Sequence, residues 1–193
     1  MLAAYWIAVD TQGKAYVYKE LYEPDLIISD AAEKIKSMMA DGELDMIRRF
    51  FAPPDLWNRR QETGKSAADI FAQHGIYLTK ASNDRVQGWY NLKEYLKPYT
   101  DEQGILTAKM LIFSCCTNLI RCIPQLQHDD KDPNDVATDP HEITHGPDAI
   151  RYFIAGRPAK AKEPVKEKSA LEKHKEQLAK RMKMNGPMGR RLM

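Results

Sequence analysis

Long apolar runs are missing from this 193-residue chain. No segment approaches the ~20 apolar residues that a membrane-spanning helix needs, so we expect no association with a membrane. Residues 1–9 are apolar, but no basic stretch precedes them and no small-residue cleavage site follows, so we expect no signal peptide. These absences predict a cytoplasmic protein.

Cysteine is scarce. The three thiols, Cys115, Cys116 and Cys122, are an odd number and lie close together in a segment predicted to be part of the core. An odd, clustered set argues against a disulfide framework. No second group of cysteine or histidine lies at zinc-ligand spacing, which argues against a structural zinc site. We expect buried thiols in a reducing compartment.

A phosphate-binding loop for ATP is also absent. The segment Gly64-Lys65-Ser66 has the ending of such a loop, but the required glycine five residues before Gly64 is replaced by Arg59. Ser66 and Asp69 instead have the spacing of a capping box at the start of a helix. We therefore expect no ATPase activity from this chain.

The small net charge of +2 conceals an uneven distribution. Residues 157–193 hold 12 of the 29 basic residues and only 4 of the 27 acidic ones. A basic tail of this kind suits a polyanion such as nucleic acid, although a solvated, weakly helical terminus has the same composition. We place the domain in residues 1–156 and a basic linker and tail, helical or disordered, in residues 157–193.

Strand and helix signals alternate along residues 1–156. Alternating apolar residues and a turn signal predict a β-hairpin, and later strands are bounded by proline or glycine. Helices follow from apolar spacing, with Ser29, Ser66 and Thr117 as candidate N-caps and a proline in the first turn of the last helix. The predicted strands are 2–9, 15–21, 46–52, 76–79 and 109–114, and the helices are 29–39, 66–74, 85–96, 117–126 and 147–155. This order predicts an α/β fold with a mixed sheet flanked by helices.

Four segments carry a more specific signal: Ala15–Glu20, Pro53–Arg60, Ile76–Trp89 and His141–Tyr152. In order and spacing they resemble the C-terminal nuclease domain of tailed-phage terminase large subunits, over about three quarters of the chain. The resemblance implies a ribonuclease-H-like fold that cuts concatemeric DNA during genome packaging, with Mg²⁺ or Mn²⁺ in a two-metal site. It also implies a phage or prophage protein in a bacterial host. Its partners would be double-stranded phage DNA, the terminase small subunit, the portal and an upstream ATPase domain.

The resemblance assigns two acids to the metal site. Asp55 follows the predicted strand 46–52, and Asp148 lies in the first turn of the predicted helix 147–155. Cleavage of a phosphodiester requires clustered carboxylates that hold two cations ~4 Å apart. By resemblance, Asp55 and Asp148 are two of three such acids, and His145 supports them without binding the metal. Taken singly, Asp55 also suits a turn and Asp148 also suits a helix start, where it would complement the dipole.

Polar and basic side chains follow two of the predicted strands. They are suited to contact the phosphates of a DNA backbone, although solvated loop charge is an equal alternative. Trp57 and Trp89 are interpreted as packing residues, and Glu20 as a surface charge of the hairpin rather than a further acid. The candidate DNA-binding residues are Arg59, Arg60, Lys80, Asn83 and Arg85.

One element of the resembled family has no counterpart. The family places its first catalytic Asp on a central strand before the hairpin, whereas this chain opens inside what corresponds to the second strand. Asp10 lies in the hairpin turn and does not replace it. We expect the hairpin to be separated from the remaining strands, with unpaired strand edges. The upstream part would be lost, omitted by a start at an internal methionine, or present as a separate chain.

Three functions remain open at this point. The first is a metal-dependent DNA endonuclease domain. The second is a catalytically inactive prophage fragment that keeps only surfaces for DNA or for other parts of the packaging motor. The third is another ribonuclease-H-like nuclease, related to resolvases or transposases.

Overall fold

The fold of this computed structural model starts with the hairpin formed by β1 (Leu2–Val9) and β2 (Ala15–Glu23), which pair in antiparallel orientation. The turn is held by Asp10, whose Oδ1 accepts hydrogen bonds from the backbone N–H groups of Gln12 and Lys14. Gly13 takes a φ of 91°, a conformation that glycine adopts without strain. The predicted hairpin and the predicted place of Asp10 in its turn are both confirmed.

The strands form three separate groups, and the hairpin belongs to the first. The first has the order β1-β2-β7, in which β7 (Met110–Ile112) pairs in parallel with β2. The second is the parallel pair β3 (Phe50–Ala52) and β4 (Leu78–Lys80), and the third is the short antiparallel pair β5 (Tyr99–Thr100) and β6 (Leu106–Thr107). Within residues 1–157 no strand pairs with the outer edge of β1 or β3, as expected, and the hairpin shares no ladder with the β3–β4 pair. The expected separation of the hairpin from all the remaining strands is wrong, because β7 pairs with β2.

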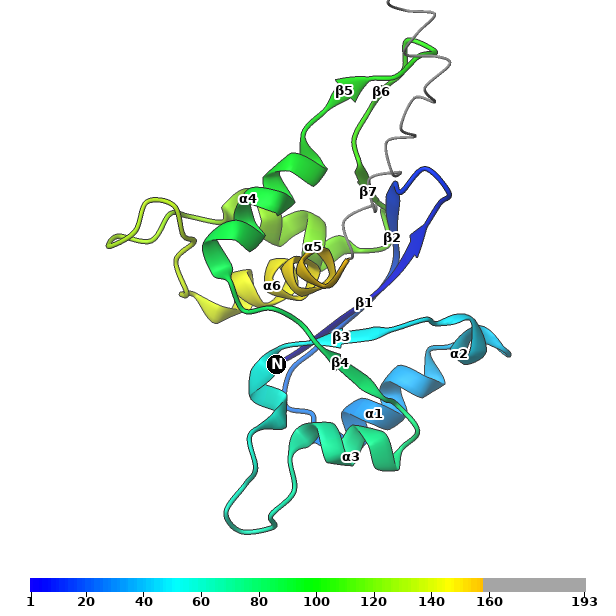
Figure 1. The fold of residues 1–193 in the computed structure, drawn as a ribbon, viewed down its shortest axis with the longest axis vertical. Coiled ribbons are helices and arrows are strands. Elements are labelled where there is room, and N and C mark those ends of the chain that lie inside the picture. The colour runs from blue at the N-terminus through cyan, green and yellow to red at the C-terminus, as the bar shows by residue number, and fades with distance from the viewer. Residues whose placement is uncertain (158–193) are drawn as a thin grey trace, which may run out of the picture. The chain divides into compact units, whose positions relative to one another are not determined.

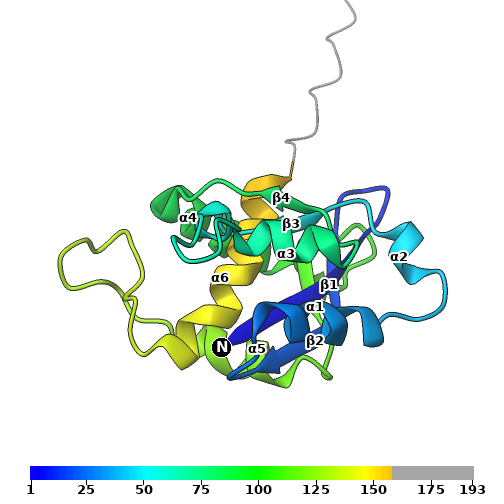
Figure 2. The ribbon, with the colours of Figure 1, turned by 90° about the horizontal axis from the view of Figure 1, so that it is seen from below.

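Helices cover both faces of these strands. On one side lie α4 (Arg85–Leu96), α5 (Thr117–Cys122) and α6 (His141–Gly156), and on the other lie α1 (Ile28–Ser37) and α3 (Ala67–Gln73) (Figures 1 and 2). Each layer encloses a hydrophobic core, one around Val17, Met110 and Ile150 and the other around Trp6, Leu21 and Ile35. The predicted mixed α/β architecture with a mixed sheet flanked by helices is confirmed.

The long helix α6 connects the strand groups. A Cβ added at Gly146 would lie 2.6 Å from Tyr5 Oη on β1, and one added at Gly156 would overlap the ring of Phe51 on β3. At Gly146 and at its last residue, Gly156, α6 therefore packs so closely against side chains of these strands that a larger residue has no room. Through these contacts α6 fixes the position of β1 and β3 in the absence of shared hydrogen bonds.

The structure describes residues 1–157, so the predicted tail, 157–193, lies outside the described residues except for Arg157. Among the helices of residues 1–157, none combines the length and the apolar character needed to cross a bilayer.

Several predicted boundaries are confirmed. Helix α4 spans the predicted residues 85–96. Ser66 and Asp69 form the predicted capping box at the start of α3, with Ser66 Oγ accepting from the Asp69 N–H and Asp69 Oδ2 accepting from the Ser66 N–H. These signals are local, so the sequence contains all the information that they need.

Other boundaries are wrong. Helix α1 begins at Ile28, so Ser29 lies inside it rather than capping it, and Cys116, not Thr117, precedes α5. The predicted strand 46–52 is reduced to β3, preceded by the short helix α2 (Glu43–Met46). Helix α5 ends at Cys122 and continues as a 3₁₀ turn, Ile123–Gln125. The last helix begins at His141, six residues before the predicted start at Pro147.

A buried carboxylate ties α2 to the hairpin. Glu43 is only 7% exposed, and its oxygens accept hydrogen bonds from Tyr18 Oη (2.7 Å), Lys19 Nζ (2.7 Å) and the Ala40 N–H (2.8 Å). The Lys19 ammonium also lies 5.2 Å from the centre of the Trp6 ring. The hydrogen bonds from Lys19, the Ala40 N–H and Tyr18 lower the pKa of Glu43 from 4.5 to about 2, against the opposing effect of burial.

This pKa shift predicts an acid-sensitive contribution to stability. Because the pKa is depressed in the folded state, the contribution is fully present above pH 4.5 and is lost as the pH falls toward 2. In thermal unfolding followed by circular dichroism, Glu43→Gln should show a smaller loss of Tm over this range than the wild type. Glu62→Gln, which changes an exposed side chain, is the control. Equal slopes in wild type and Glu43→Gln would contradict the assignment.

Candidate functional site

Four of the predicted site residues meet where β3 and β4 end. Asp55 is exposed in the 3₁₀ turn η1 (Pro54–Trp57) directly after β3, and Lys80 is the last residue of β4, paired with Ala52. Because β3 and β4 are parallel, their carboxyl ends lie at one edge. The chain then runs through Asn83 into α4, which begins at Arg85. The Lys80 ammonium lies 5.3 Å from the centre of the Trp57 ring.

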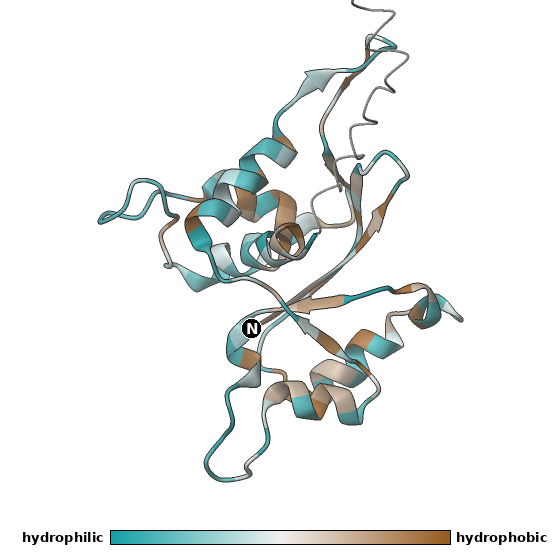
Figure 3. Ribbon diagram, in the orientation of Figure 1, coloured by the Kyte–Doolittle hydropathy of each residue, from teal (hydrophilic) through white to brown (hydrophobic). Residues whose placement is uncertain are grey.

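Arg59 and Arg60 lie in a neighbouring exposed loop. Arg59 forms a β-bridge with Ser66, and the Arg60 backbone exchanges hydrogen bonds with Lys65 (3.1 Å) and Gly64 (2.8 Å). These bonds shape residues 59–66 into a small hairpin-like loop of hydrophilic residues, beside η1 in the fold (Figure 3). Among residues 1–157, neither arginine pairs with a carboxylate, so both are available to an anionic partner.

Asp148 occupies a different position from the one predicted. Because α6 begins at His141, Asp148 lies in the body of the helix rather than in its first turn, and it does not complement the helix dipole at its start. Its side chain is one quarter exposed, and Oδ1 accepts a hydrogen bond of 2.8 Å from Arg151 Nε. Arg85 Nη1 lies 3.7 Å from the second carboxylate oxygen. Asp148 is therefore the anionic partner of two arginines.

Arg151 is a fully buried charge. None of its side chain is exposed, and its guanidinium lies over the rings of Tyr152 (4.4 Å) and Trp89 (5.4 Å). Longer hydrogen bonds connect it to the carbonyl of Asp84 (3.5 Å) and to Asn83 Oδ1 (3.4 Å). Gly88 on α4 makes the space, since a Cβ there would approach Arg151 Cγ to 2.7 Å. A charge so enclosed needs its carboxylate partner.

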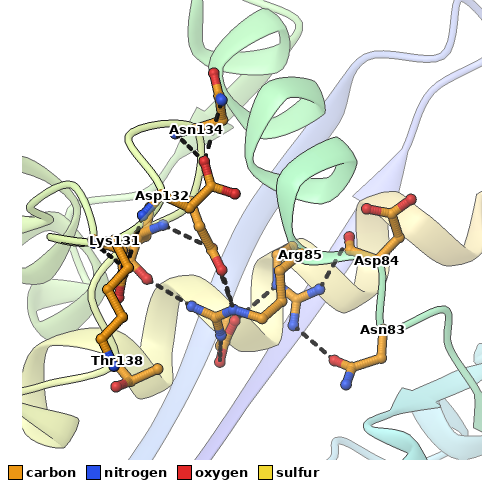
Figure 4. Close-up of polar contacts among 12 residues, drawn as sticks. Asn83, Asp84, Arg85, Lys131, Asp132, Asn134 and Thr138 are labelled. Carbon is orange, nitrogen blue, oxygen red and sulfur yellow. Dashed lines mark hydrogen bonds and ion pairs between the residues drawn. The ribbon is translucent and has the colours of Figure 1, made fainter.

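Arg85 joins the same network to the loop that precedes α6. Its Nε donates to Asp135 Oδ2 (2.9 Å) and its Nη2 donates to the carbonyl of Val136 (2.7 Å). Figure 4 shows Arg85 at the start of α4, near the loop that holds Asp132 and Asn134. Burial opposes ionisation of Asp135, but the hydrogen bonds from Arg85 and from the Val136 N–H hold its pKa below the usual value. Arg85 is thus a structural clamp as well as a candidate DNA contact.

Tyr152 belongs to the same network. Its hydroxyl donates to Asn83 Oδ1 over 3.2 Å. Burial raises the pKa of Tyr152, Arg151 opposes the rise, and the negative charges of Asp148 and Asp55 add to it. Among residues 1–157, no hydrogen bond or ion pair joins Asp55 to Asp148 or to Tyr152.

His145 and Glu20 have other surroundings than the acids. The His145 ring lies 5.5 Å from that of His141, and burial, followed by His141, lowers its pKa, while Asp148 opposes this. It makes no hydrogen bond to Asp148 within the described residues.

Glu20 caps α5, accepting from the N–H groups of Asn118 (3.0 Å) and Leu119 (2.8 Å). Its interpretation as a hairpin surface charge is wrong.

Two of the site's principal residues, Arg151 and Tyr152, were not predicted. An arginine in an amphipathic helix usually indicates surface charge, because burial of a guanidinium depends on partners from other elements. The signal available was its position three residues after Asp148, a spacing that brings the two side chains to one face of a helix.

The described residues do not make up a complete metal centre. Within residues 1–157, no three His, Cys, Asp or Glu side chains lie close enough together to hold one cation. Asp55 and Asp148 offer two carboxylates, and the second is already neutralised by guanidinium groups. The predicted Mg²⁺ or Mn²⁺ pair does not fit this donor set alone.

Comparison with protein-family models, with curated proteins and with solved structures gave no match.

The buried Arg151 makes Asp148 essential for stability. Asp148→Ala should lower the free energy of unfolding by about 3 kcal/mol or more, because a buried guanidinium loses its charged partner. Urea unfolding followed by tryptophan fluorescence measures this. Asp45→Ala, an exposed aspartate, should change stability by less than ~0.5 kcal/mol. Adding Arg151→Met to Asp148→Ala should recover part of the loss, and an Asp148→Ala protein as stable as the wild type would refute the pairing.

Proposed function

We propose that this chain is a ribonuclease-H-like nuclease domain of the kind found in phage DNA-packaging terminases, and that it contributes Asp55 and Asp148 to a DNA-cleaving site. The observation that carries the proposal is the place of the two acids in the fold. Asp55 directly follows β3, and Asp148 lies in α6, the helix that packs against Tyr5 on β1 and Phe51 on β3. The order of the elements, hairpin, parallel strand pair and closing helix, also supports it.

The surroundings of the acids suit a polyanionic substrate. Exposed basic side chains stand beside Asp55, in the loop 59–66 and at the end of β4. Such groups grip the phosphates of a nucleic-acid backbone and place it, without reading its sequence. The residues with this role are Arg59, Arg60 and Lys80. Double-stranded DNA is the proposed substrate, and the packaging motor's small subunit, portal and ATPase domain are its proposed partners.

Cation-dependent cleavage also requires donors that residues 1–157 do not supply. Two divalent cations would provide the activated water and the charge to stabilise the leaving oxygen. In the described chain, Arg151 and Arg85 orient and neutralise Asp148, and Asp55 is exposed to solvent. We therefore assign no chemical step to residues 1–157 alone, and the proposal requires a further carboxylate from outside them.

The second candidate is a binding domain without catalysis. The ion pairs of Asp148 favour it, because a carboxylate that compensates a buried guanidinium has a sufficient structural reason to be present. In this case the same basic loop residues bind DNA or another part of the motor, and Asp55 is a turn residue.

Plasmid cleavage separates the two candidates. Under the nuclease candidate, in which the full-length protein completes the donor set from outside residues 1–157, the wild type with Mn²⁺ or Mg²⁺ should nick or linearise supercoiled plasmid. Asp55→Asn should then reduce the rate by about 100-fold or more, as expected for loss of a group that acts in the transition state. Asp55 is preferred to Asp148 for this test because its side chain is exposed and, among residues 1–157, forms no ion pair. Asp45→Asn is the matched control.

The outcomes are distinct. Cleavage that requires metal and Asp55 supports the nuclease. Absence of cleavage by folded wild-type protein overturns it for this chain and leaves the binding domain. Cleavage that survives Asp55→Asn contradicts the assignment of Asp55.

DNA binding is expected under both candidates and is measured without metal. In EDTA, the affinity for a duplex should fall with salt. Arg59→Ala with Arg60→Ala should reduce the slope of log K against log [salt] by about 0.9 for each phosphate that is no longer neutralised. Lys36→Ala, an exposed lysine on α1, should leave the slope unchanged. Fluorescence anisotropy at several salt concentrations measures the slope. An unchanged slope in the double variant would show that the loop 59–66 does not contact the DNA.

A further inference from the structure

A polar cavity lies away from the acids, at the turn of the hairpin. It has a volume of about 280 Å³. Three segments form it: the β1–β2 turn, the end of α4 with the start of β5, and the residue before β7. Its lining residues are Gln12, Gly13, Lys14, Tyr95, Tyr99 and Lys109.

Hydrogen bonds between the segments hold the walls together. Arg157 Nη1 donates to the carbonyl of Gly13 and to Tyr95 Oη, each over 3.0 Å, and its guanidinium lies 5.6 Å from the Tyr95 ring centre. The Lys14 ammonium donates to Thr107 Oγ1 on β6. The backbone of Ala15 donates to the carbonyl of Lys109 over 2.8 Å. The cavity is therefore a product of the fold rather than a gap between loose loops.

The chemistry of the lining is cationic and aromatic. Within residues 1–157, neither Lys14 nor Lys109 forms an ion pair with a carboxylate. Asp10, the acid of the adjoining turn, is engaged by two backbone N–H groups and by Tyr16 Oη (3.2 Å). The exposed Tyr99 ring, 44% accessible, offers an aromatic face. Lysine ammonium groups bind the phosphate of a nucleotide, and an aromatic ring stacks on its base. This cavity offers both kinds of group side by side.

We infer that this cavity binds one nucleotide unit, with its phosphate on Lys14 and Lys109 and its base against Tyr99. The volume is just below the ~300 Å³ at which small-ligand sites begin, which suits one unit rather than two. The site is separate from the acids. Arg157, which bonds to Gly13 and Tyr95 of the cavity wall, follows Asp148 by nine residues, which corresponds to ~13 Å along a helix. The unit is either a free nucleotide or part of a single strand, and the inference does not depend on nuclease activity.

Binding to the full chain in EDTA tests this site without any contribution from cleavage. The probes are dTMP, 5′-phosphorylated dT4, dT4 lacking the phosphate and inorganic phosphate, each measured by calorimetry. Lys109→Ala should weaken binding of the phosphorylated probes about tenfold, the effect expected for one charged hydrogen bond. Tyr99→Leu should weaken binding of the nucleotides but not of inorganic phosphate. Lys36→Ala is the control for general charge.

Each outcome decides the inference. If dTMP binds as tightly as the phosphorylated tetranucleotide and both depend on Lys109, the site takes a free nucleotide. If only the tetranucleotides bind, and their binding also depends on Lys109, the site takes part of a single strand. Failure of all probes to bind folded protein overturns the inference, as does binding that Lys109→Ala and Lys36→Ala affect equally. Circular dichroism of each variant establishes that it is folded. Loss of plasmid cleavage alone would leave this result unaffected.

Discussion

The buried guanidinium of Arg151 is the constraint on which the site depends. A full charge without solvent contact is tolerated only with a carboxylate partner and aromatic faces around it, and the protein supplies Asp148, Trp89 and Tyr152. The close approach of α4 and α6 at Gly88 follows from the same requirement. Asp148 therefore has a stabilising role whatever chemistry it also serves. The stability and the function of this region are not separable by a change at Asp148 alone.

The region of the acids exists because α6 bridges two strand groups that share no ladder. This helix contacts both Tyr5 on β1 and Phe51 on β3, and Asp148 lies between the two contacts. Asp55 directly follows β3, in the turn η1. Within residues 1–157 the outer edges of β1 and β3 have no strand partner, which leaves their backbone groups available to a further strand.

The sequence predicted the elements whose signals are local. The capping box of α3, the bounds of α4 and the hairpin needed only nearby residues. The start of α6 was predicted too late because proline is favoured in the first turn of a helix, which pointed to Pro147. In the structure the helix begins before Pro147, since Ile143 and Gly146 are buried against the rest of the protein. The capping of α5 by Glu20 joins residues about a hundred positions apart in the sequence. The burial of Arg151 depends on its contacts with α4. Periodicity within one segment reveals neither. Metal binding by the acids requires a third donor, and residues 1–157 bring none close to them.

The pairing of β2 with β7 has a consequence for how the chain folds. Ala15 lies opposite Met110, so the hairpin is complete long before its third strand has been synthesised. Translation at about 5–20 residues per second separates the two events by several seconds. During that interval the apolar face of β2, with Val17 at its centre, has no partner. Contacts of such long sequence separation are also slow to form, so early folding of this protein is exposed to misassembly until β7 arrives.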